Sequence, residues 1–520
     1  MFDTVESLGG VDDSALIDAI ITGERAEAMA ASTRLTAMGE LVARRCGNQG
    51  ERERWACDGW DAAAAEIGAA LNIGRRAASR DMHIAMALRE RHPKIAALLA
   101  AGDIPIGLVE TICWHTTLVS EPDTMALIDT ALAGALNGWG RLSGPKLMGL
   151  IDGWVEKFDP AAVRRTRNRA RARTVELGKP EDRSGVASIW GALLATDAAL
   201  LDARLSAMAS QVCHDDPRTV GQRRSDALGT LAAGSLQLAC LCGTTDCPAT
   251  IDDARAAAVT VHVLAQTVPA PADSPADPMI NGPHHQALTP EPQPPATTEQ
   301  AAVGYVLGGM LMPAILFADL ISRGAKVHTV TSIESLTGKS GYRPTARLDE
   351  FVRMRDMTCM FPGCDHPAVT CDIDHTIPWP SGPTHPANLS PKCRKHHLLK
   401  TFWTGPGGWR DRQLPDGSIV WTAPTGHSYI SVPGSRILFP DHAITTPLPT
   451  TDTRDLDIPD APGRGLMMPT RRKTRTQDHA RRIAYERTLN EQELADAGSE
   501  PEKPSTPRQP APAIDDPPPF

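Results

Sequence analysis

Apolar residues recur at helical spacing through most of the first half of the chain. In residues ~13–46, Leu, Ile, Met and Val follow this period, and Asp12, Asp13 and Ser14 are candidates to cap the helix. Further helical blocks run from ~55 to 101 and from ~106 to 136, and Ala-rich helices with short polar joints continue to ~265. The pattern predicts a mainly α-helical N-terminal domain over residues 13–330. It contains a few strands, with one candidate at 258–265.

The hydrophobic pattern changes at three places further along. The longest apolar stretch, Val303 to Ile321, is interrupted by Pro313 and Asp319, which favours a buried helix pair or turn over a membrane span. Residues 267–298 are rich in proline and read as a linker or loop. Proline and polar residues dominate again over 444–520, which predicts a disordered, partly basic tail. Within it, residues ~472–497 can form one isolated charged helix.

Composition adds that the chain holds more than one domain. Its 520 residues are too many for a single core, and 41% are hydrophobic. The net charge of −9 provides no bulk attraction to nucleic acid, so any DNA contact must come from local basic patches. Arg-rich residues 163–173, together with RRKTR at 471–475 and HARR at 479–482, are such patches. The 163–173 segment is interpreted either as a phosphate-contacting arm or as a solvated helix face.

Residues 64–88 resemble a helix-turn-helix. Ile67, Leu71 and Ile73, with Gly74 near the turn, occupy the apolar and turn positions. Arg75, Arg76 and Arg80 would then lie on the second helix, where DNA-binding proteins place base-reading residues. An ordinary tight helical hairpin meets the same pattern and is the favoured interpretation.

The cysteines favour metal binding over disulfide bonds. There are 11, an odd number, and the first residues lack the basic start and apolar run of a signal peptide, which predicts a cytoplasmic protein. Cys240, Cys242 and Cys247 form one cluster, CLCGTTDC, suited to a metal or redox site. A Cys-rich turn without metal is an equal alternative, because no fourth ligand is adjacent and the nearest upstream histidine is His214.

A second set of potential metal ligands occurs as two short-spaced pairs. Cys359 and Cys364 have four residues between them, Cys393 and His396 have two, and the pairs lie some thirty residues apart. This spacing is typical of a tetrahedral structural Zn²⁺ site that joins two distant segments. The segment between the pairs is small and rich in Pro and Gly, so a metal would supply stability that its own core cannot.

Between these pairs lies a set of residues suited to phosphoryl chemistry. Residues 369–374 alternate with a strand period and end at Asp374 and His375. A loop with Asn388 follows, and then a helix that places His397 and Lys400 one turn apart. A carboxylate and an imidazole can hold a divalent cation while a second imidazole activates water.

Residues 359–400 closely resemble the HNH endonuclease family, whose pattern runs C-x₂₋₄-C, D-H, N-L and C-x-x-C-H-x-x-K. The resemblance implies a small α+β module of the ββα-metal type, placed here over residues 340–432. One departure is His396, where the family more often has cysteine. Histidine is also a normal zinc ligand.

The resemblance also implies a role for each matching residue. Asp374 and His397 would hold the catalytic divalent ion, Mg²⁺ or a similar cation, at the scissile phosphate of DNA. His375 would be the general base that takes a proton from the attacking water. Asn388 would brace the loop and orient that base, and Lys400 would contact phosphate.

Most of residues ~15–432 are also similar to the 13E12 repeat family, an actinobacterial family that is abundant in mycobacteria. In this family a helical domain of unknown function precedes an HNH module. The segment 216–231, DPRTVGQRRSDALGTL, is similar to the central motif of that helical domain. The resemblance predicts a metal-dependent DNA endonuclease. The alternative is a non-catalytic DNA- or partner-binding protein of a mobile element with a vestigial nuclease module. Neither function involves a membrane.

Overall fold

The structure is a computed structural model of the chain, and it is mainly helical with a small sheet-containing C-terminal region. It describes residues 10–47, 50–136, 143–163, 173–178, 186–252, 341–404, 408–438 and 467–499, with short pieces between 254 and 329 and residue 446. Two compact units divide the chain. The first contains Met1–Gly39, Ile84–Arg165 and Lys473–Phe520, and the second contains Glu40–His83 and Thr166–Arg472.

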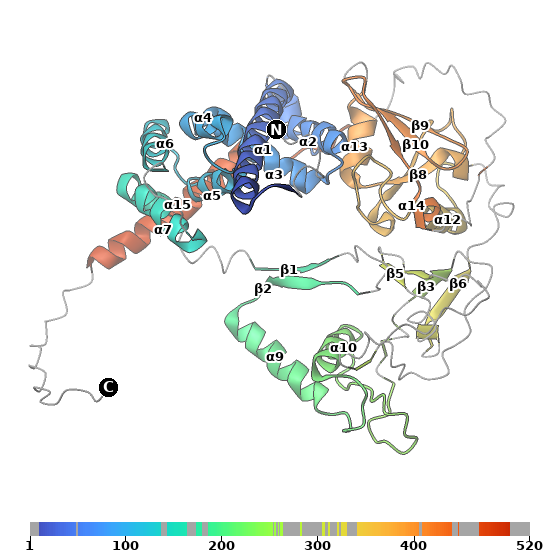
Figure 1. Cartoon of the computed structure of the whole chain (residues 1–520). Coiled ribbons are helices and arrows are strands. Elements are labelled where there is room, and N and C mark those ends of the chain that lie inside the picture. The colour runs from blue at the N-terminus through green and yellow to red at the C-terminus, as the bar shows by residue number, and fades with distance from the viewer. Residues whose placement is uncertain are drawn as a thin grey trace, which may run out of the picture. The chain divides into compact units, whose positions relative to one another are not determined.

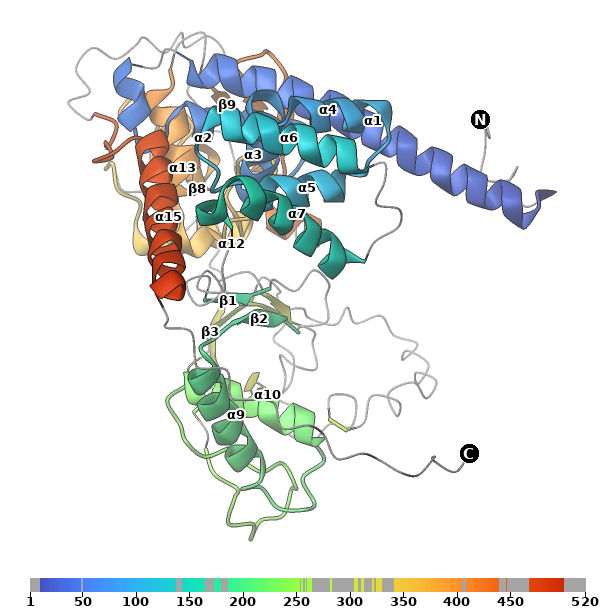
Figure 2. The ribbon, with the colours of Figure 1, turned by 90° about the vertical axis from the view of Figure 1, so that its left-hand side faces the viewer.

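The first unit is built from helices that gather together in both Figure 1 and Figure 2. They are the first part of α1 (Asp13–Cys46), the end of α3 (Arg75–Glu90), α4 (Pro93–Ala101), α5 (Ile106–His115), α6 (Pro122–Leu136), α7 (Gly144–Phe158), η3 (Pro160–Ala162) and α15 (Arg475–Ser499). The predicted helix over 13–46 is confirmed. The blocks predicted over 55–101 and 106–136 are each divided into shorter helices.

Local chemistry explains these divisions. α2 (Gly59–Leu71) ends because Asn72 takes the left-handed conformation at φ 53°. Pro93 begins α4 because proline cannot continue a preceding helix but fits the first turn of a new one. α5 ends where the Thr116 hydroxyl donates a hydrogen bond to the carbonyl of Ile112, and α6 then begins at Pro122.

α15 confirms the helix predicted near 472–497, but the expectation that it is isolated is wrong. Asn490 is buried, and its side-chain amide donates hydrogen bonds to the carbonyls of Ala161 and Val163 at 2.8 and 2.9 Å. Arg487 pairs with Asp159 at 2.6 Å. These polar contacts dock the helix against η3, and the charge-rich sequence pattern does not reveal them. The tail residues 500–520 lie outside the described residues.

The middle of the second unit holds short strands and one helix pair. The strands are β1 (Thr174–Leu177), β2 (Ile189–Ala192), β3 (Thr260–Val263), β4 (Gly304–Val306), β5 (Met310–Met312) and β6 (Lys326–Thr329), and the helices are α9 (Ala195–Ala209) and α10 (Val220–Ala232). β1 pairs with β2, and a four-stranded sheet has the order β5-β4-β3-β6. β3 confirms the strand predicted at 258–265.

The apolar stretch 303–321 contributes β4 and β5, which pair antiparallel. Of the two predicted alternatives, a buried helix pair or a turn, the helix pair is therefore wrong for residues 304–312. β-branched and unbranched apolar residues in so short a run do not distinguish a buried strand from a buried helix. No helix of the described ranges is long and apolar enough to cross a membrane. The proline-rich residues 267–298, apart from 281–282, lie outside the described residues.

The C-terminal part of the second unit carries the candidate site. Its elements are α12 (Ala346–Asp356), η6 (Ala368–Thr370), β7 (Asp372–His375), η7 (Pro386–Asn388), β8 (Leu389–Lys392), α13 (Arg394–Phe402), β9 (Arg410–Gln413), β10 (Ile419–Thr422), β11 (Ser428–Ser431) and α14 (Gly434–Leu438). β7 and β8 pair antiparallel and α13 follows them, while β11-β10-β9 form a second sheet (Figure 1). The strand expected over 369–374 begins only at Asp372, because residues 368–370 form a 3₁₀ turn.

The core of this part includes residues from far earlier in the chain. Buried side chains of α2 pack with fully buried Trp421 and with Phe361 in one cluster. Cys57 lies between the 3₁₀ turn η2 (Gly50–Arg54) and α2. Its carbonyl accepts a hydrogen bond from Trp403 Nε1 at 3.0 Å. α2 thus packs against α13 of the C-terminal part. The domain boundaries 13–330 and 340–432 stay a prediction.

Candidate functional site

The two predicted ligand pairs of the C-terminal part come together. The ligand atoms of Cys359, Cys364, Cys393 and His396, here named the C-terminal cluster, all lie within 4.8 Å of one another. His396 Nδ1 is 3.3 Å from Cys393 Sγ and 3.5 Å from Cys359 Sγ. Three sulfurs and one imidazole nitrogen are soft and borderline donors that suit a tetrahedral metal such as zinc.

Backbone contacts and aromatic packing build this cluster. Cys393 caps the start of α13, and its backbone N–H donates to Cys359 Sγ at 3.2 Å. The ring of Phe361 stacks on the His396 imidazole with 3.9 Å between centroids. Burial raises the pKa of Cys359, whereas hydrogen bonds from Cys359 and Cys364 hold the pKa of Cys393 far below its usual range. The arrangement therefore favours a thiolate at Cys393.

Beside this cluster, β7 and α13 bring a carboxylate and an imidazole face to face. Asp374 Oδ1 lies 3.6 Å from His397 Nε2. The other ring nitrogen of His397, Nδ1, lies 2.8 Å from Asp372 Oδ2. Because a carboxylate accepts a hydrogen bond from Nδ1–H, Asp372 leaves the lone pair of Nε2 directed toward Asp374. This is the arrangement of a histidine that ligates a metal through Nε2.

The second oxygen of Asp374 belongs to a different set of contacts. Asp374 Oδ2 lies 2.9 Å from Lys400 Nζ and 3.4 Å from Lys392 Nζ, and both ammonium groups also pair with Asp411. Burial alone would raise the pKa of Asp374, but the two lysines hold it well below its usual range. Asp374 is therefore ionised, and its Oδ1 is the oxygen that faces His397 Nε2.

His375, the expected base, follows Asp374 but makes different contacts. Its Nε2 lies 2.9 Å from Thr384 Oγ1, and the Thr384 hydroxyl donates to the carbonyl of Gly341 at 2.5 Å. A hydroxyl has one proton, so Thr384 must accept from His375 Nε2–H, and the basic lone pair is on Nδ1. Tyr342 stacks on the imidazole with 5.6 Å between centroids. Burial, aided by Lys400 and Lys392, lowers the pKa of His375, which keeps the ring neutral.

Asn388 closes the loop that follows β7. Its Oδ1 accepts a hydrogen bond from the backbone N–H of Ile377 at 2.8 Å. Its Nδ2 donates to the carbonyls of Ile377 and Pro383 at 3.0 and 2.9 Å. These three bonds join the two ends of the loop between Ile377 and Asn388, while the role of Asn388 that the HNH resemblance implies stays a prediction. They hold the loop that carries Thr384, and through Thr384 they position His375.

A protein family matches most of the chain. The family described as "Domain of unknown function (DUF222)" matches residues 22–356, which is more than half of the 520 residues. The chain belongs to the DUF222 family. The matched residues end three positions before Cys359. The C-terminal cluster therefore lies beyond the DUF222 match, as does the group formed by Asp374, His375, Asn388 and His397 with their partners, here named the polar site.

Mycobacterial relatives extend over nearly the whole DUF222 chain. "Uncharacterized protein Rv2100" of Mycobacterium tuberculosis (strain ATCC 25618 / H37Rv) is 50% identical over 505 residues, covering 94% of this chain and 90% of the relative. "Uncharacterized protein Rv3776" of the same strain is 50% identical over 490 residues, covering 93% of this chain and 91% of the relative. "Uncharacterized protein in est 3'region" of Mycobacterium tuberculosis is 47% identical over 351 residues, covering 67% of this chain and 98% of the relative. No solved structure was found that matches the chain. The expected kinship with mycobacterial proteins is confirmed, and the HNH resemblance stays a prediction.

Sequence reasoning missed four residues at the polar site of this DUF222 protein. Asp372 had a usable signal, because residues two apart on a strand share a face and Asp372 precedes Asp374 by two. Lys392 lies opposite Asp372 in the antiparallel register of β7 and β8, so it faces the same side of the sheet. Thr384 and Asp411 lie on a loop and on β9, and no local pattern connects them to β7. Lys400, expected at phosphate, pairs with Asp374 and Asp411.

The candidate DNA-binding segments of the DUF222 chain are only partly described. α2 and α3 form the two helices predicted at 64–88, joined by a short turn, and Arg75 pairs with Asp61 at 3.4 Å. Arg76 and Arg80 lie exposed on α3, so groove binding and an ordinary helical hairpin both stay open. The Arg-rich residues 164–172 lie outside the described residues. Arg471 pairs with Asp58 and Asp61, which makes it a structural contact.

Proposed function

We propose that the C-terminal part of this protein is a metal-dependent HNH-type endonuclease that hydrolyses DNA phosphodiester bonds. The observation that carries the proposal is the geometry of Asp374, His397 and Asp372. An ionised carboxylate oxygen faces an imidazole nitrogen at 3.6 Å, and a second carboxylate fixes the tautomer of that imidazole. A merely structural hairpin has no need of this arrangement. DNA as substrate comes from the family resemblance.

The residues present fit a divalent cation at this position. Asp374 Oδ1 and His397 Nε2 would hold it, while Asp374 Oδ2 stays with the lysines. When bound, such an ion supplies charge stabilisation for the phosphoryl group and the leaving oxygen. The C-terminal cluster would hold a structural Zn²⁺, which fixes the start of α13 and therefore the place of His397.

The chain's own residues account for the proton transfers. Nδ1 of His375 takes a proton from water, the water oxygen attacks phosphorus, and the bond from phosphorus to the 3′ oxygen breaks. A neutral imidazole with a lowered pKa is ready to accept that proton. Thr384 holds the ring in the tautomer that leaves Nδ1 basic, and Asn388 holds the loop. The departing 3′ oxygen takes its proton from solvent.

The decisive test is plasmid cleavage by the full-length protein with Mg²⁺ or Mn²⁺, with and without chelator. We expect His375→Ala to reduce cleavage by roughly 10²–10⁴-fold, the usual contribution of a general base. His375→Gln is a second variant that retains a polar partner for Thr384, in case the alanine destabilises the loop. Exposed His427, which contacts Thr425, provides the control His427→Ala. Cleavage at the wild-type rate by both His375 variants contradicts the proposal.

Two further variants separate the base from the metal ligand. His397→Ala should also abolish cleavage, but an excess of divalent ion should partly restore it, because the defect is in ion affinity. His375→Ala should show no such recovery. Thr384→Val should lower kcat and leave KM unchanged, because it removes the acceptor that fixes the His375 tautomer. A change confined to KM would assign Thr384 to substrate binding.

One observation favours a second function, that of a non-catalytic DNA- or partner-binding module. Lys392 and Lys400 neutralise Asp374 and Asp411 without any ion, so the hairpin and α13 can be held by these four residues alone. In that case the full-length protein would bind DNA and show the same low cleavage with or without Mg²⁺. Lys400→Met distinguishes the two. It should unfold a purely structural quartet but leave a metal-supported one folded when Mg²⁺ is present.

A further inference from the structure

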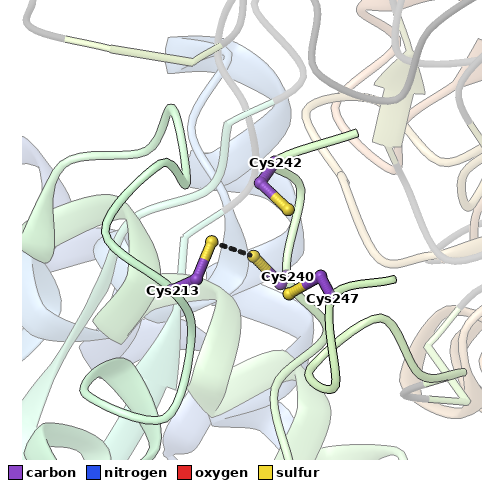
Figure 3. A group of neighbouring side chains, drawn as sticks. All are labelled: Cys213, Cys240, Cys242 and Cys247. Atoms are coloured by element: carbon purple, nitrogen blue, oxygen red, sulfur yellow. Dashed lines mark hydrogen bonds between the residues drawn. The ribbon is translucent and has the colours of Figure 1, made fainter. Parts of the chain in front are cut away.

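A second group of ligands lies in the middle of the chain, away from the site described above. The ligand atoms of Cys213, Cys240, Cys242 and Cys247, here named the central cluster, lie within 4.8 Å of one another. Figure 3 shows the four sulfur atoms turned toward one another from three chain segments, with Cys213 and Cys240 3.4 Å apart. Cys213 is the fourth ligand that the motif CLCGTTDC lacks.

A buried ion pair brings the separate segments together. Arg218 and Asp216 are both fully buried and bond at 2.7 Å. Arg218 also donates to the carbonyl of Ala239 at 2.6 Å, and Asp216 accepts from the backbone N–H of Leu241 at 2.9 Å. The pair therefore ties the chain just after Cys213 to the residues on both sides of Cys240. Burying two charges is costly, and the hydrogen bonds that Arg218 and Asp216 make to each other and to the backbone offset that cost.

The turn that follows returns Cys247 to the same point. Gly243 takes φ +73°, a conformation that glycine adopts readily, so the chain reverses directly after Cys242. Cys247 N–H donates to the carbonyl of Thr244 at 3.2 Å, and Cys240 N–H donates to the carbonyl of Ala249 at 2.8 Å. Cys240 and Cys247 are thus each held by a backbone hydrogen bond.

The apolar cluster around the four cysteines is small in the described part of the chain. It consists of the buried residues Val212, Leu238 and Cys240, with the remaining three cysteines and Ala249 packed against them. Segments with so small a core depend on a staple such as a metal or disulfides. Two disulfides would pair the sulfurs two by two, whereas here all four converge. In a tetrahedral Zn–S₄ centre with bonds of about 2.3 Å, the sulfurs lie about 3.8 Å apart, which agrees with this convergence.

We propose that the central cluster is a second structural zinc site, coordinated by four thiolates, within the DUF222 part of the chain. Each of the four thiols releases one proton when the ion binds, so that Zn²⁺ with four thiolates carries a net charge of −2. No oxidant takes part. The bound ion would join α9 to α10 through the segments that follow each helix, independently of the nuclease chemistry.

The test is the metal content of full-length protein purified under reducing conditions. We expect two zinc ions per chain by elemental analysis, one for each cluster. Cys213→Ser and Cys242→Ser should each reduce the content to one, whereas Cys46→Ser, which lies outside both clusters, should leave two. Cys393→Ser should also reduce the content to one, but by loss of the C-terminal ion. Two ions retained in Cys213→Ser would overturn the proposal, and this outcome is independent of any nuclease activity.

A second measurement covers the case in which the cysteine variants do not fold. Wild-type protein is treated with a thiol-alkylating reagent before and after chelator, and the modified peptides are mapped by mass spectrometry. We expect Cys213, Cys240, Cys242 and Cys247 to be protected together and to become reactive together once the ion is removed. Substitution with Co²⁺ should give two spectral components, from S₄ and S₃N ligand sets. Independent alkylation of the four thiols, or a Cys213–Cys240 disulfide in the freshly purified protein, would overturn the proposal.

Discussion

The C-terminal cluster is held by an aromatic core, whereas the central cluster is held by a buried ion pair. Phe361, Trp409 and Trp421 surround the first, and Phe361 stacks directly on a ligand. At the second, Arg218 and Asp216 hold the cysteine-bearing segments together through hydrogen bonds. Similar ligand sets can therefore be positioned by apolar packing or by polar contacts. A carboxylate–histidine pair lies beside each cluster, but His214 and Asp215 beside the central cluster are exposed, whereas His397 beside the first cluster is more buried and contacts both Asp372 and Asp374. Ligand convergence alone therefore does not indicate chemistry.

The largest expected effect is the loss of a ligand from the C-terminal cluster. Cys393→Ser should remove the zinc ion and unfold the C-terminal part, because structural zinc contributes about 10–16 kcal/mol of apparent binding free energy in small domains. Thermal unfolding, followed by tryptophan fluorescence, measures the change. The matched control is Cys371→Ser, a buried cysteine of the same core that lies outside the cluster. If both variants lose the same stability, the cluster is ordinary core packing.

The next effect sharpens the contrast at the central cluster. Arg218→Met should destabilise the region by about 3–5 kcal/mol, because it removes the closest ion-pair partner of the buried Asp216 carboxylate and leaves Arg223, at 3.5 Å, as its remaining ion-pair partner in the described part of the chain. The control is Arg224→Met, since the Arg224–Asp202 pair is more exposed and such pairs contribute about 0–1 kcal/mol. Denaturant unfolding measures both. Equal losses from the two variants would mean that Arg218 is no scaffold for the cysteines.

The smallest effect concerns the residue that sets the His397 tautomer. Asp372→Asn should weaken divalent-ion affinity by roughly 10–100-fold, the usual cost of losing a carboxylate behind a ligating histidine, and leave the zinc content unchanged. Titration of cleavage activity against Mn²⁺ measures it. Arg394→Gln is the control, because Arg394 also contacts Asp372, at 3.2 Å. An equal loss in the control would assign the effect to the ion pair instead of to His397.

The sequence allowed prediction of those features that depend on local spacing. The helix α1, the strand β3, the helix α13 and the convergence of Cys359, Cys364, Cys393 and His396 follow from periodicity and short ligand pairs. The turn near Gly74, between α2 and α3, was predicted, whereas the break at Pro93 was missed because apolar periodicity continues across it. Residues brought together by tertiary packing had no local signal. Cys213 lies 27 residues before Cys240, and the hydrogen bonds of Arg218 and Asp216 bring the two segments together.

The polar site shows the same limit. Asp374, His375, Asn388 and His397 were predicted because a family pattern joins them, and the structure brings Asp374 to His397 and Asn388 to the loop after His375. Their orienting partners Asp372 and Thr384 act through side-chain hydrogen bonds that spacing does not encode.

The packing of α2 against the C-terminal part has a consequence for biosynthesis. Asp61 pairs with Arg471, 410 residues later in the chain. At roughly 5–20 residues per second, the ribosome needs roughly 20–80 s to make the residues between them. During that interval the apolar face of α2 lacks its final neighbours, and contacts so distant in sequence form slowly. In the nascent chain, the apolar face of α2 is therefore exposed until the C-terminal part has been synthesised. We expect chaperones to bind α2 during this interval.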